Sequence, residues 1–501
     1  MKASSIKKTT ESKITKSKKP ALVLVKSGSG RKPKEEDRPQ KGKVKKERAK
    51  RYPLTELGNA ERFFDDNKED LLFCPEKDTW YLWTGKRWAF ADNRLLLQRA
   101  KLTVRRMKKE AKANTDKVKA DELRKFWKKC DKISQLQQVI NGAKIDPRIQ
   151  VEDIKMDDHP MLLNCDNGVL DLATGETKEH DRKLFLTHKL NAAYDSGAKC
   201  PEWLKLIDKI TGGEKGFRSY LQRVAGYALS GDIGEKCFFI IVGPTNTGKS
   251  TFLEILLEMM GSELGKKADL KSFLRSGYQT QVRTDLARLA KARLVVAAEG
   301  EMSDRFHDSL LKQFTGGDGM VARFLYQEHF EFNPQCKIFI GTNHVPKITG
   351  SDDAMWGRVK FIPFDVQIAE EEKDKSLKSK LRNEFPGILA WAVRGAMKFK
   401  KVGLKQPAFL EEVNEKLRMK ADPFYAFIKT KCVRDPDAEE PFSKLYSAWT
   451  TWCRKEDFEP GTDKAFGMML TTYRFEQYTD RHGLQTVRIR TGIRLKKKSK
   501  V

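Results

Sequence analysis

The eight residues Gly243–Ser250, Gly-Pro-Thr-Asn-Thr-Gly-Lys-Ser, constrain the fold more than any other part of the chain. They follow the apolar run Cys237–Val242 and precede a helical pattern that begins at Thr251. A glycine-rich loop between a buried strand and a helix lets backbone N–H groups surround phosphate oxygens at the positive end of the helix. The spacing G-x-x-x-x-G-K-S therefore predicts a phosphate-binding loop in an α/β domain.

The motif also assigns a role to its individual side chains. Lys249 is expected to neutralise the β- and γ-phosphates of ATP, and Ser250 is expected to bind Mg²⁺. The predicted nucleotide-binding residues are Gly243, Pro244, Thr245, Asn246, Thr247, Gly248, Lys249, Ser250 and Thr251. A chance match of a loop is the alternative, but the strand before the motif and the helix after it argue against that alternative.

Three further apolar runs follow the loop, at Leu294–Ala298, Lys337–Gly341 and Val359–Phe364. Continuous apolar runs are typical of strands that are buried on both faces of a parallel sheet. Helical or hairpin stretches separate these runs. The alternation predicts a parallel sheet with helices on both faces.

Polar side chains stand at or near the ends of these strands. Glu299 and Glu301 follow the strand Leu294–Ala298. We expect Glu299 to bind the metal or activate water, with Glu301 close behind. Asn343 follows the strand Lys337–Gly341 and could orient the attacking water. Arg358 could stabilise the charge that develops during phosphoryl transfer, on the ATP of a neighbouring chain. A commonplace strand-end carboxylate and a surface ion pair are the alternatives for Glu299 and Arg358.

The chain is strongly basic, with a formal net charge of +29 over 501 residues. Lysine and arginine attract the phosphates of a polyanion, so nucleic acid is the expected partner. Residues 1–50 contain almost no aromatic residues and are expected to form a disordered basic tail. That tail could bind nucleic acid, act as an import signal, or only keep the protein soluble, and a basic tail on an unrelated enzyme remains an alternative.

The regions on either side of the phosphate loop have their own patterns. Trp80–Trp88 predicts a hairpin, Leu95–Val139 predicts helix, and Leu162–Leu172 predicts a short strand pair. Near the end of the chain, residues 486–495 alternate, with Arg488, Arg490 and Arg494 on one face. Such a basic β-wing suits the backbone of duplex DNA, and a solvated basic edge strand is the alternative.

Taken in order, these residues resemble the superfamily 3 helicases, most closely the helicase part of the poxvirus and phage/plasmid primase–helicase family. The motifs that carry the resemblance, besides the phosphate loop, are Lys312–Asp318, Ala322-Arg323, Phe330–Phe332, Pro334, Thr342–Pro346 and Ile362–Phe364. Upstream they are Gly58–Arg62, Trp83–Trp88, Asn164–Gly168, Leu170–Leu172 and Gly175, and downstream Ser443, Leu445, Tyr446, Trp449, Trp452, Phe466 and Gly492-Ile493. The resemblance covers about residues 52–495.

The resemblance implies an α/β, AAA+-like P-loop ATPase core with an α+β N-terminal domain and a C-terminal winged-helix domain. The expected organisation is a tail at 1–50, the N-terminal domain at 51–200, the ATPase at 201–400, the winged-helix domain at 408–495 and a basic tail at 496–501. Larger members carry a primase domain before the helicase part. Since only the basic tail precedes residue 52, we expect no primer synthesis.

The implied activity is that of an ATP hydrolase and DNA helicase. It would form a homohexameric ring and translocate 3′ to 5′ on single-stranded DNA at replication forks of a virus or mobile element. In related motors an extra hairpin touches DNA; here it is Met320–Phe332, with Arg323, Tyr326 and His329 as expected contacts and core-facing roles as the alternative for the last two. Phe324 stands where many relatives carry a basic residue, and Gly357-Arg358 where many carry paired arginines.

Other functions compete with this hypothesis. The chain could be an ATP-switched, origin-binding replication initiator, a genome-packaging or RNA-translocating P-loop motor, or, least consistently, a small-molecule kinase. ATP and Mg²⁺ are the expected cofactors, and a separate primase or polymerase is a possible partner. Without a membrane-length apolar segment, we expect a protein in the cytoplasm of a host cell, or in the nucleus of a eukaryotic host.

Overall fold

The structure, a computed structural model, describes residues 52–274, 284–298, 306–324, 329–346, 348, 353–482 and 485–497. Residues 52–501 form one unit by their internal contacts, and the predicted basic tail lies outside the described residues. Within the described ranges, none of the helices combines the length and the apolar character that a membrane-spanning segment needs.

The N-terminal part combines a small antiparallel sheet with four helices. Its elements are α1 (Glu56–Asn67), β1 (Leu71–Cys74), β2 (Thr79–Trp83), β3 (Trp88–Phe90), α2 (Asn93–Ala113), α3 (Lys117–Cys130) and α4 (Ile133–Lys144). The pairing of Trp83 with Trp88 confirms the predicted hairpin. The helical prediction is also confirmed, but the segment divides into three helices. Asp92 and Asp116 cap the starts of α2 and α3 by accepting backbone N–H bonds, which explains where these helices begin.

A second antiparallel sheet joins this part to the phosphate-loop domain. It consists of β4 (Leu162–Cys165), β5 (Gly168–Asp171) and β6 (Thr177–Lys178), so the predicted strand pair is confirmed and gains a third, very short strand. The buried Asp157, which precedes β4, holds the segment that follows β6. Its carboxylate accepts from the backbone N–H of Thr187 at 2.6 Å and contacts Nδ1 of His188 at 3.0 Å.

A five-stranded parallel sheet forms the centre of the phosphate-loop domain. Its strands are β7 (Phe238–Val242), β8 (Gly265–Asp269), β9 (Leu294–Ala298), β12 (Lys337–Thr342) and β13 (Val359–Pro363), in the spatial order β13-β7-β12-β9-β8. The four apolar runs are strands, as predicted. The edge strand β8 was not predicted, because its sequence Gly-Lys-Lys-Ala-Asp lacks an apolar run.

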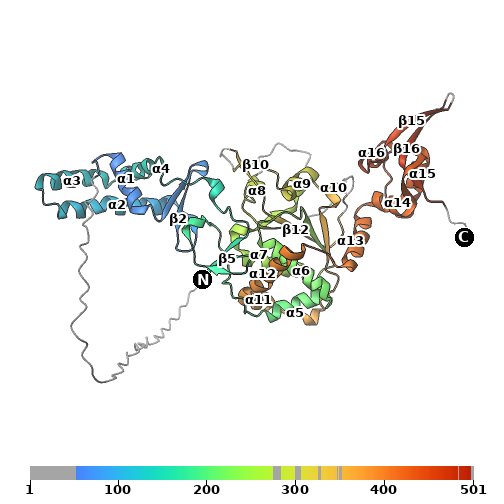
Figure 1. Ribbon diagram of the computed structural model, residues 1–501, viewed down its shortest axis with the longest axis horizontal. Helices are drawn as coiled ribbons and strands as arrows, with labels where there is room; N and C mark the ends of the chain where they lie inside the picture. Colours follow the sequence, from blue (N-terminus) through green and yellow to red (C-terminus); the bar gives the residue numbers. More distant parts are fainter. Residues whose placement is uncertain are drawn as a thin grey trace, which may run out of the picture. The chain divides into compact units, whose positions relative to one another are not determined.

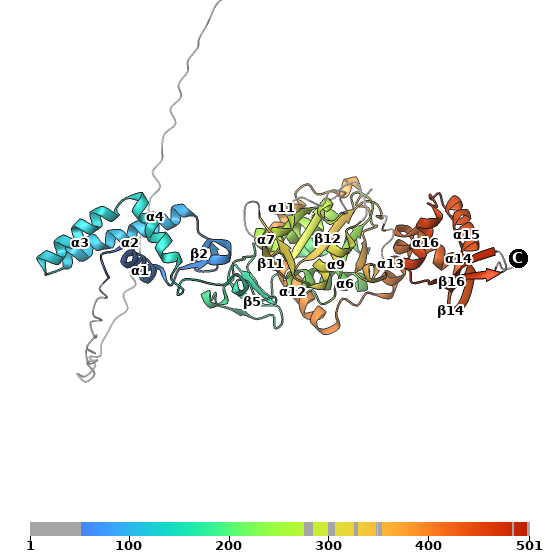
Figure 2. The same ribbon diagram turned by 90° about the horizontal axis from the view of Figure 1, so that it is seen from above.

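Helices cover both faces of this sheet (Figures 1 and 2). Phe239 and Ile241 of β7 share one core with α5 (Pro201–Ile210), α6 (Lys215–Leu229), α7 (Lys249–Leu264), α11 (Leu377–Asn383) and α12 (Phe385–Val402). Phe238 and Ile240 share the other core with α8 (Thr284–Ala287), α9 (Asp308–Gly316) and α10 (Asp353–Trp356). The alternation along β7 therefore supplies both hydrophobic cores, as expected for a mixed α/β fold.

Helices α6 and α12 pack at very short range. A Cβ atom on Gly395 would lie 1.8 Å from the carbonyl oxygen of Gln222, and one on Gly226 would lie 2.0 Å from the nitrogen of Ala396. Only glycine fits such an approach of two backbones. The two glycines therefore fix how closely these helices pack on the sheet.

Two buried basic side chains lie at the end of the sheet where β9 and β12 begin. The ammonium of Lys337 donates to the carbonyl oxygens of Asp232 at 3.2 Å and Gln335 at 3.1 Å, and that of Ser230 is a third acceptor. Arg293 donates to the carbonyl of Leu229 at 3.0 Å. Burial lowers the pKa of Lys337 to about 7 and that of Arg293 to about 10. Both side chains satisfy carbonyls at the end of α6.

The last part of the chain begins with a helix that packs on the parallel sheet. Asn414 of α13 (Ala408–Ala421) accepts the backbone N–H of Phe361 at 2.9 Å and donates to its carbonyl at 3.0 Å. The elements that follow are α14 (Pro423–Lys431), β14 (Cys432–Pro441), α15 (Phe442–Lys455), α16 (Asp463–Thr472), β15 (Gln477–His482) and β16 (Gln485–Leu495). The three strands form an antiparallel sheet in the order β14-β16-β15.

This sheet corrects the prediction for its arginines. β16 is the central strand, so the edge-strand alternative is wrong. Arg490 is buried and donates to the carbonyls of Phe475 at 2.9 Å and Gly467 at 3.0 Å, because the strand turns this position toward α16. Arg488 is exposed and Arg494 is half-buried, so these two remain from the predicted basic face.

Candidate nucleotide-binding site

The phosphate loop connects β7 to α7 and has the geometry of an anion cradle. A Cβ atom on Gly243 would lie 2.0 Å from the carbonyl oxygen of Phe364, so this position requires glycine. Gly248 is the N-cap of α7 and has φ +86°. Because glycine has no side chain that could accept a hydrogen bond, the first N–H groups of the helix have no side-chain cap. Uncapped N–H groups at a helix N-terminus favour an anion.

Lys249 places its charge inside this loop. Its side chain is buried, and the ammonium donates to the carbonyls of Gly243 at 2.7 Å and Pro244 at 2.6 Å. Thr247 supports the turn by donating its hydroxyl to the Pro244 carbonyl at 3.1 Å. Ser250 is exposed in the first turn of α7. The structure thus brings together the lysine and the hydroxyl that the motif predicts.

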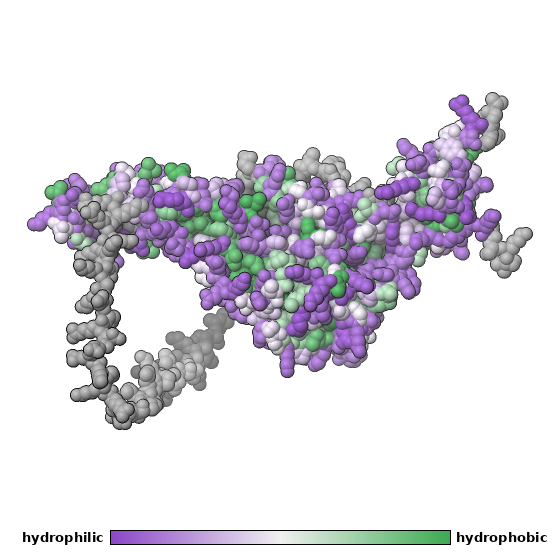
Figure 3. Space-filling view, in the orientation of Figure 1, coloured by the Kyte–Doolittle hydropathy of each residue, from purple (hydrophilic) through white to green (hydrophobic). Residues whose placement is uncertain are grey.

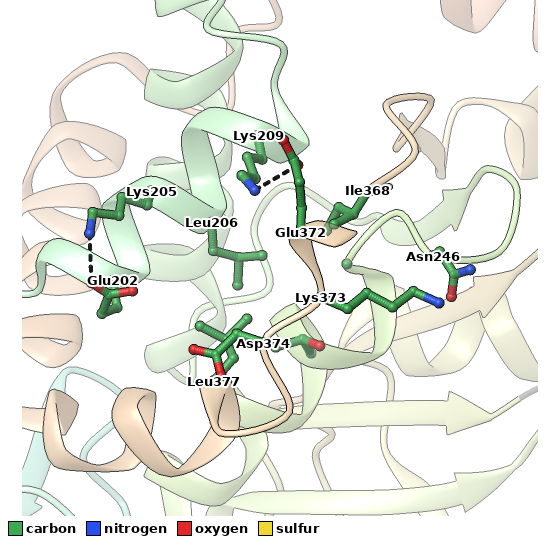
Figure 4. A pocket seen from close by; sticks show the side chains of 12 residues that line it. Glu202, Lys205, Leu206, Lys209, Asn246, Ile368, Glu372, Lys373, Asp374 and Leu377 are labelled. Atoms are coloured by element: carbon green, nitrogen blue, oxygen red, sulfur yellow. Dashed lines mark hydrogen bonds and ion pairs between the residues drawn. The ribbon is translucent and has the colours of Figure 1, made fainter. Parts of the chain in front are cut away.

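A cavity of about 270 Å³ opens beside the loop (Figure 4). Leu206, Ile368 and Leu377 supply apolar wall, and Asn246 of the loop supplies a polar group. Ion pairs at 2.8 Å between Lys209 and Glu372 and at 2.7 Å between Lys205 and Glu202 lie at its border. Half of the twelve lining residues are charged: Glu202, Lys205, Lys209, Glu372, Lys373 and Asp374. The cavity therefore offers an apolar wall to a base and polar groups to a ribose. Sequence reasoning missed this cavity, because its residues come from α5, the loop and the segment after β13, which only the fold brings together.

Asn343 lies next to the phosphate loop, as predicted. Thr342 at the end of β12 pairs with Val242 at the end of β7, and the N–H of Gly243 donates to the Thr342 carbonyl at 3.3 Å. The half-buried Asn343 follows directly. β9 runs parallel to β12 on its other side. Glu299 and Glu301 follow β9 in the sequence and lie outside the described residues.

Arg358 lies at the other end of the same strands. It immediately precedes β13, and its carbonyl accepts the N–H of Phe238, the first residue of β7. The loop follows the last residue of β7, so the five residues of this strand, roughly 16 Å, separate Arg358 from the loop. Its guanidinium donates to the Lys236 carbonyl at 3.3 Å, and its buried Nε has no hydrogen-bond partner among the described residues.

The predicted DNA-contacting hairpin is confirmed as a strand pair. β10 (Met320–Ala322) and β11 (Phe330–Phe332) are antiparallel. Arg323 is half-buried just after β10, His329 is exposed just before β11, and Tyr326 lies outside the described residues. Phe324 stacks on Phe330 with ring centroids 5.7 Å apart. The phenylalanine that departs from the family pattern therefore pairs the two arms of the hairpin.

Comparisons with known proteins follow the same division of the chain. The D5 N terminal like family matches residues 60–212, and a family of unknown function, DUF5906, matches residues 241–358. The helicase candidate L207/L206 of Acanthamoeba polyphaga mimivirus is 28% identical over 320 residues, which is 59% of this chain and 33% of that protein. The chain is therefore similar, over 59% of its length, to a viral protein named as a helicase candidate.

A second viral protein matches a similar share of this chain. Helicase candidate 121R of Invertebrate iridescent virus 3 is 24% identical over 332 residues, covering 59% of this chain and 35% of that protein. The chain thus spans about a third of the length of these two relatives. Among solved structures, the apo C-terminal region of NrS-1 matches with a TM-score of 0.44 at 10% identity, covering 88% of this chain and 100% of that one.

Proposed function

We propose that this chain is an ATP-dependent DNA helicase that works as a ring and completes each ATP site between two chains. The observation that carries the proposal is the placement of the phosphate loop and Arg358 at opposite ends of β7. Arg358 cannot reach the phosphates bound by its own loop across about 16 Å of strand. In a head-to-tail ring, the arginine edge of one chain meets the loop edge of the next.

ATP with Mg²⁺ is the proposed cofactor. The cavity beside Asn246 would hold the nucleoside, the N-terminus of α7 and Lys249 would hold the phosphates, and Ser250 would bind Mg²⁺. A bound metal would neutralise charge on the β- and γ-phosphate oxygens. Asn343 would position the attacking water from the strand beside the loop. Glu299 and Glu301 keep the metal-linked and water-activating roles that the resemblance implies.

The proposed track is single-stranded DNA at a replication fork, with the hairpin of β10 and β11 touching the strand. Arg323 would contact phosphate, and His329 and Tyr326 would offer rings for stacking. The family resemblance supports an AAA+-like core, six chains in the ring and 3′ to 5′ movement. The virally encoded relatives support a role in the replication of a virus or mobile element, in which a separate primase or polymerase would be a partner.

An ATP-switched origin-binding initiator is the second candidate. The order helix, strand, helix, helix, hairpin in residues 423–495 supports a winged-helix unit, and α16 presents Lys464, Met468 and Thr471 to solvent. In the helix pair α15 and α16, the exposed second helix, α16, could lie in a DNA groove. Under this alternative, ATP would assemble the chains on duplex DNA without repeated turnover.

ATP hydrolysis with and without single-stranded DNA separates the two candidates. We expect DNA to stimulate hydrolysis by the full chain at a stated salt concentration, and we expect Lys249→Ala to abolish it because the phosphates lose their main cation. Fork unwinding should then require a 3′ tail rather than a 5′ tail. ATP binding without DNA-stimulated hydrolysis would contradict the motor and favour the initiator.

A further inference from the structure

Helices α2 and α3 carry a basic surface that neither the phosphate loop nor the hairpin uses. Between Asn93 and Cys130 there are fourteen lysines and arginines but only four aspartates and glutamates. Hydrophilic side chains predominate along this segment in the space-filling view (Figure 3). The excess of positive charge here therefore belongs to two folded helices rather than to a tail.

Six of these cations form one stripe along α2. They are Arg94, Lys101, Arg105, Lys108, Lys109 and Lys112, and all six residues are exposed. At 100° per residue they fall within a sector of about 100°, on the side away from the buried Ala100, Val104 and Met107. The stripe is roughly 27 Å long, since eighteen residues separate its ends at 1.5 Å each. We call it the α2 stripe.

Carboxylates neutralise the other basic residues of α2, but not the α2 stripe. Arg106 pairs with Asp66, and Arg99 lies 3.7 Å from Asp70, both on the side that faces α1. The only acidic residue of α2, Glu110, pairs with Arg62 of α1. Among the described residues, none of the six stripe cations has a carboxylate within 4.0 Å. The charge on the stripe is thus left for an external anion.

The spacing within the stripe also works against the helix itself. Like charges four residues apart, as in Lys101 and Arg105 or Lys108 and Lys112, repel each other on a helix surface. A solvated helix face usually mixes both signs. A row of cations with no carboxylate among them is therefore typical of a surface that meets a regular row of anions, such as the phosphates of a nucleic acid backbone.

The composition of the stripe favours a duplex over a single strand. Proteins that hold single strands combine cations with aromatic rings on which bases stack, and α2 contains no Phe, Tyr or Trp. Trp127 of α3 lies under one stripe residue, with the ammonium of Lys108 5.1 Å from its ring centroid, and this ring is half-buried. Contacts from lysine and arginine alone fix a duplex by its phosphates without reading bases.

We propose that the α2 stripe binds the backbone of duplex nucleic acid, as a second contact separate from the ATP-driven motor. The contact positions the chain without selecting a sequence, and it does not depend on ATP. Lys117, Arg124 and Lys128 also share a face of the neighbouring α3 by the same helical spacing, with Asp121 among them.

Salt-dependent binding of a 30-base-pair DNA by the full chain, measured by fluorescence anisotropy without nucleotide, tests the proposal. The variant neutralises four stripe residues, Lys101→Gln, Arg105→Gln, Lys109→Gln and Lys112→Gln. Each lost phosphate contact removes about 0.9 from the slope of log K against log salt. Between 50 and 200 mM salt, wild-type affinity should therefore fall about 100-fold more than that of the variant.

A matched control neutralises four exposed lysines elsewhere, Lys400→Gln, Lys401→Gln, Lys416→Gln and Lys420→Gln, and should keep the wild-type slope. A Lys→Arg variant at 101, 109 and 112 should also keep it, and melting curves check that every variant is folded. Equal slopes for wild type and the stripe variant would overturn the proposal. An equal loss on single-stranded DNA of the same length would overturn the assignment to a duplex.

Discussion

Mixing two inactive variants tests whether ATP sites form between chains. Lys249→Ala removes the cation of the loop, and Arg358→Ala removes the cation at the far end of β7. An arginine supplied by a neighbouring subunit contributes about 10³–10⁵-fold to the rate of phosphoryl transfer, so Arg358→Ala alone should lose at least about 10³-fold. Lys249→Ala alone should also be inactive, because the phosphates lose their main cation. In a ring, a site is intact when an Arg358→Ala chain, which keeps Lys249, lies next to a Lys249→Ala chain that supplies Arg358. Random 1:1 mixing makes about one quarter of the sites intact in a head-to-tail ring.

The assay is steady-state ATP hydrolysis with saturating single-stranded DNA, after the two variants are mixed, dissociated in high salt and reassembled. The mixture should recover about a quarter of wild-type hydrolysis if sites act independently. Its activity should fall on dilution, because intact sites exist only in assemblies. A mixture no more active than either variant would refute the reasoning from the strand length, as would an Arg358→Ala chain that hydrolyses ATP at the wild-type rate.

Two further predictions concern stability. The pKa of Lys337 is lowered in the folded state to about 7, so the unfolded chain binds more protons between this value and the ordinary lysine pKa. The free energy of unfolding of wild type relative to Lys337→Met should therefore rise from pH 7 to 10, by up to about 1.4 kcal/mol per pH unit in denaturant titrations; a flat difference would contradict the lowered pKa of Lys337 in the folded state. Gly395→Ala should lower the free energy of unfolding by about 1–3 kcal/mol, because its Cβ would lie 1.8 Å from the Gln222 carbonyl. Gly197→Ala, whose Cβ would meet nothing nearer than 3.5 Å, is the control and should change it by less than about 0.5 kcal/mol.

Strands buried on both faces could be located from the sequence, because a run such as Phe238–Val242 is apolar at every position. The strand β8 could not, since an edge strand with one polar side has no such run. The break between α2 and α3 depends on the polar cap Asp116 rather than on Pro or Gly. The burial of Arg490 escaped prediction because strand alternation gives two faces without saying which one packs on α16.

The candidate site was predictable where it depends on local spacing. The loop at 243–250 and the position of Asn343 follow from a motif and from the rule that parallel strands end at one edge. The cavity at Leu206 and Ile368 was not, because residues more than 160 positions apart meet there. The position of Arg358 also follows from the sequence, because it directly precedes the predicted strand Val359–Phe364, and parallel strands begin at the end of the sheet opposite the loop.

The separation of the loop from Arg358 gives the chain a front and a back. A two-fold contact made by the loop end alone would place two loops together, and one made by the arginine end alone would place two arginines together, so neither completes a site. Chains that join front to back form either an open row or a closed circle. An open row always leaves one loop without an arginine and one arginine without a loop. Closure engages both ends at once, so the last chain to enter would complete two sites, its own and that of its neighbour.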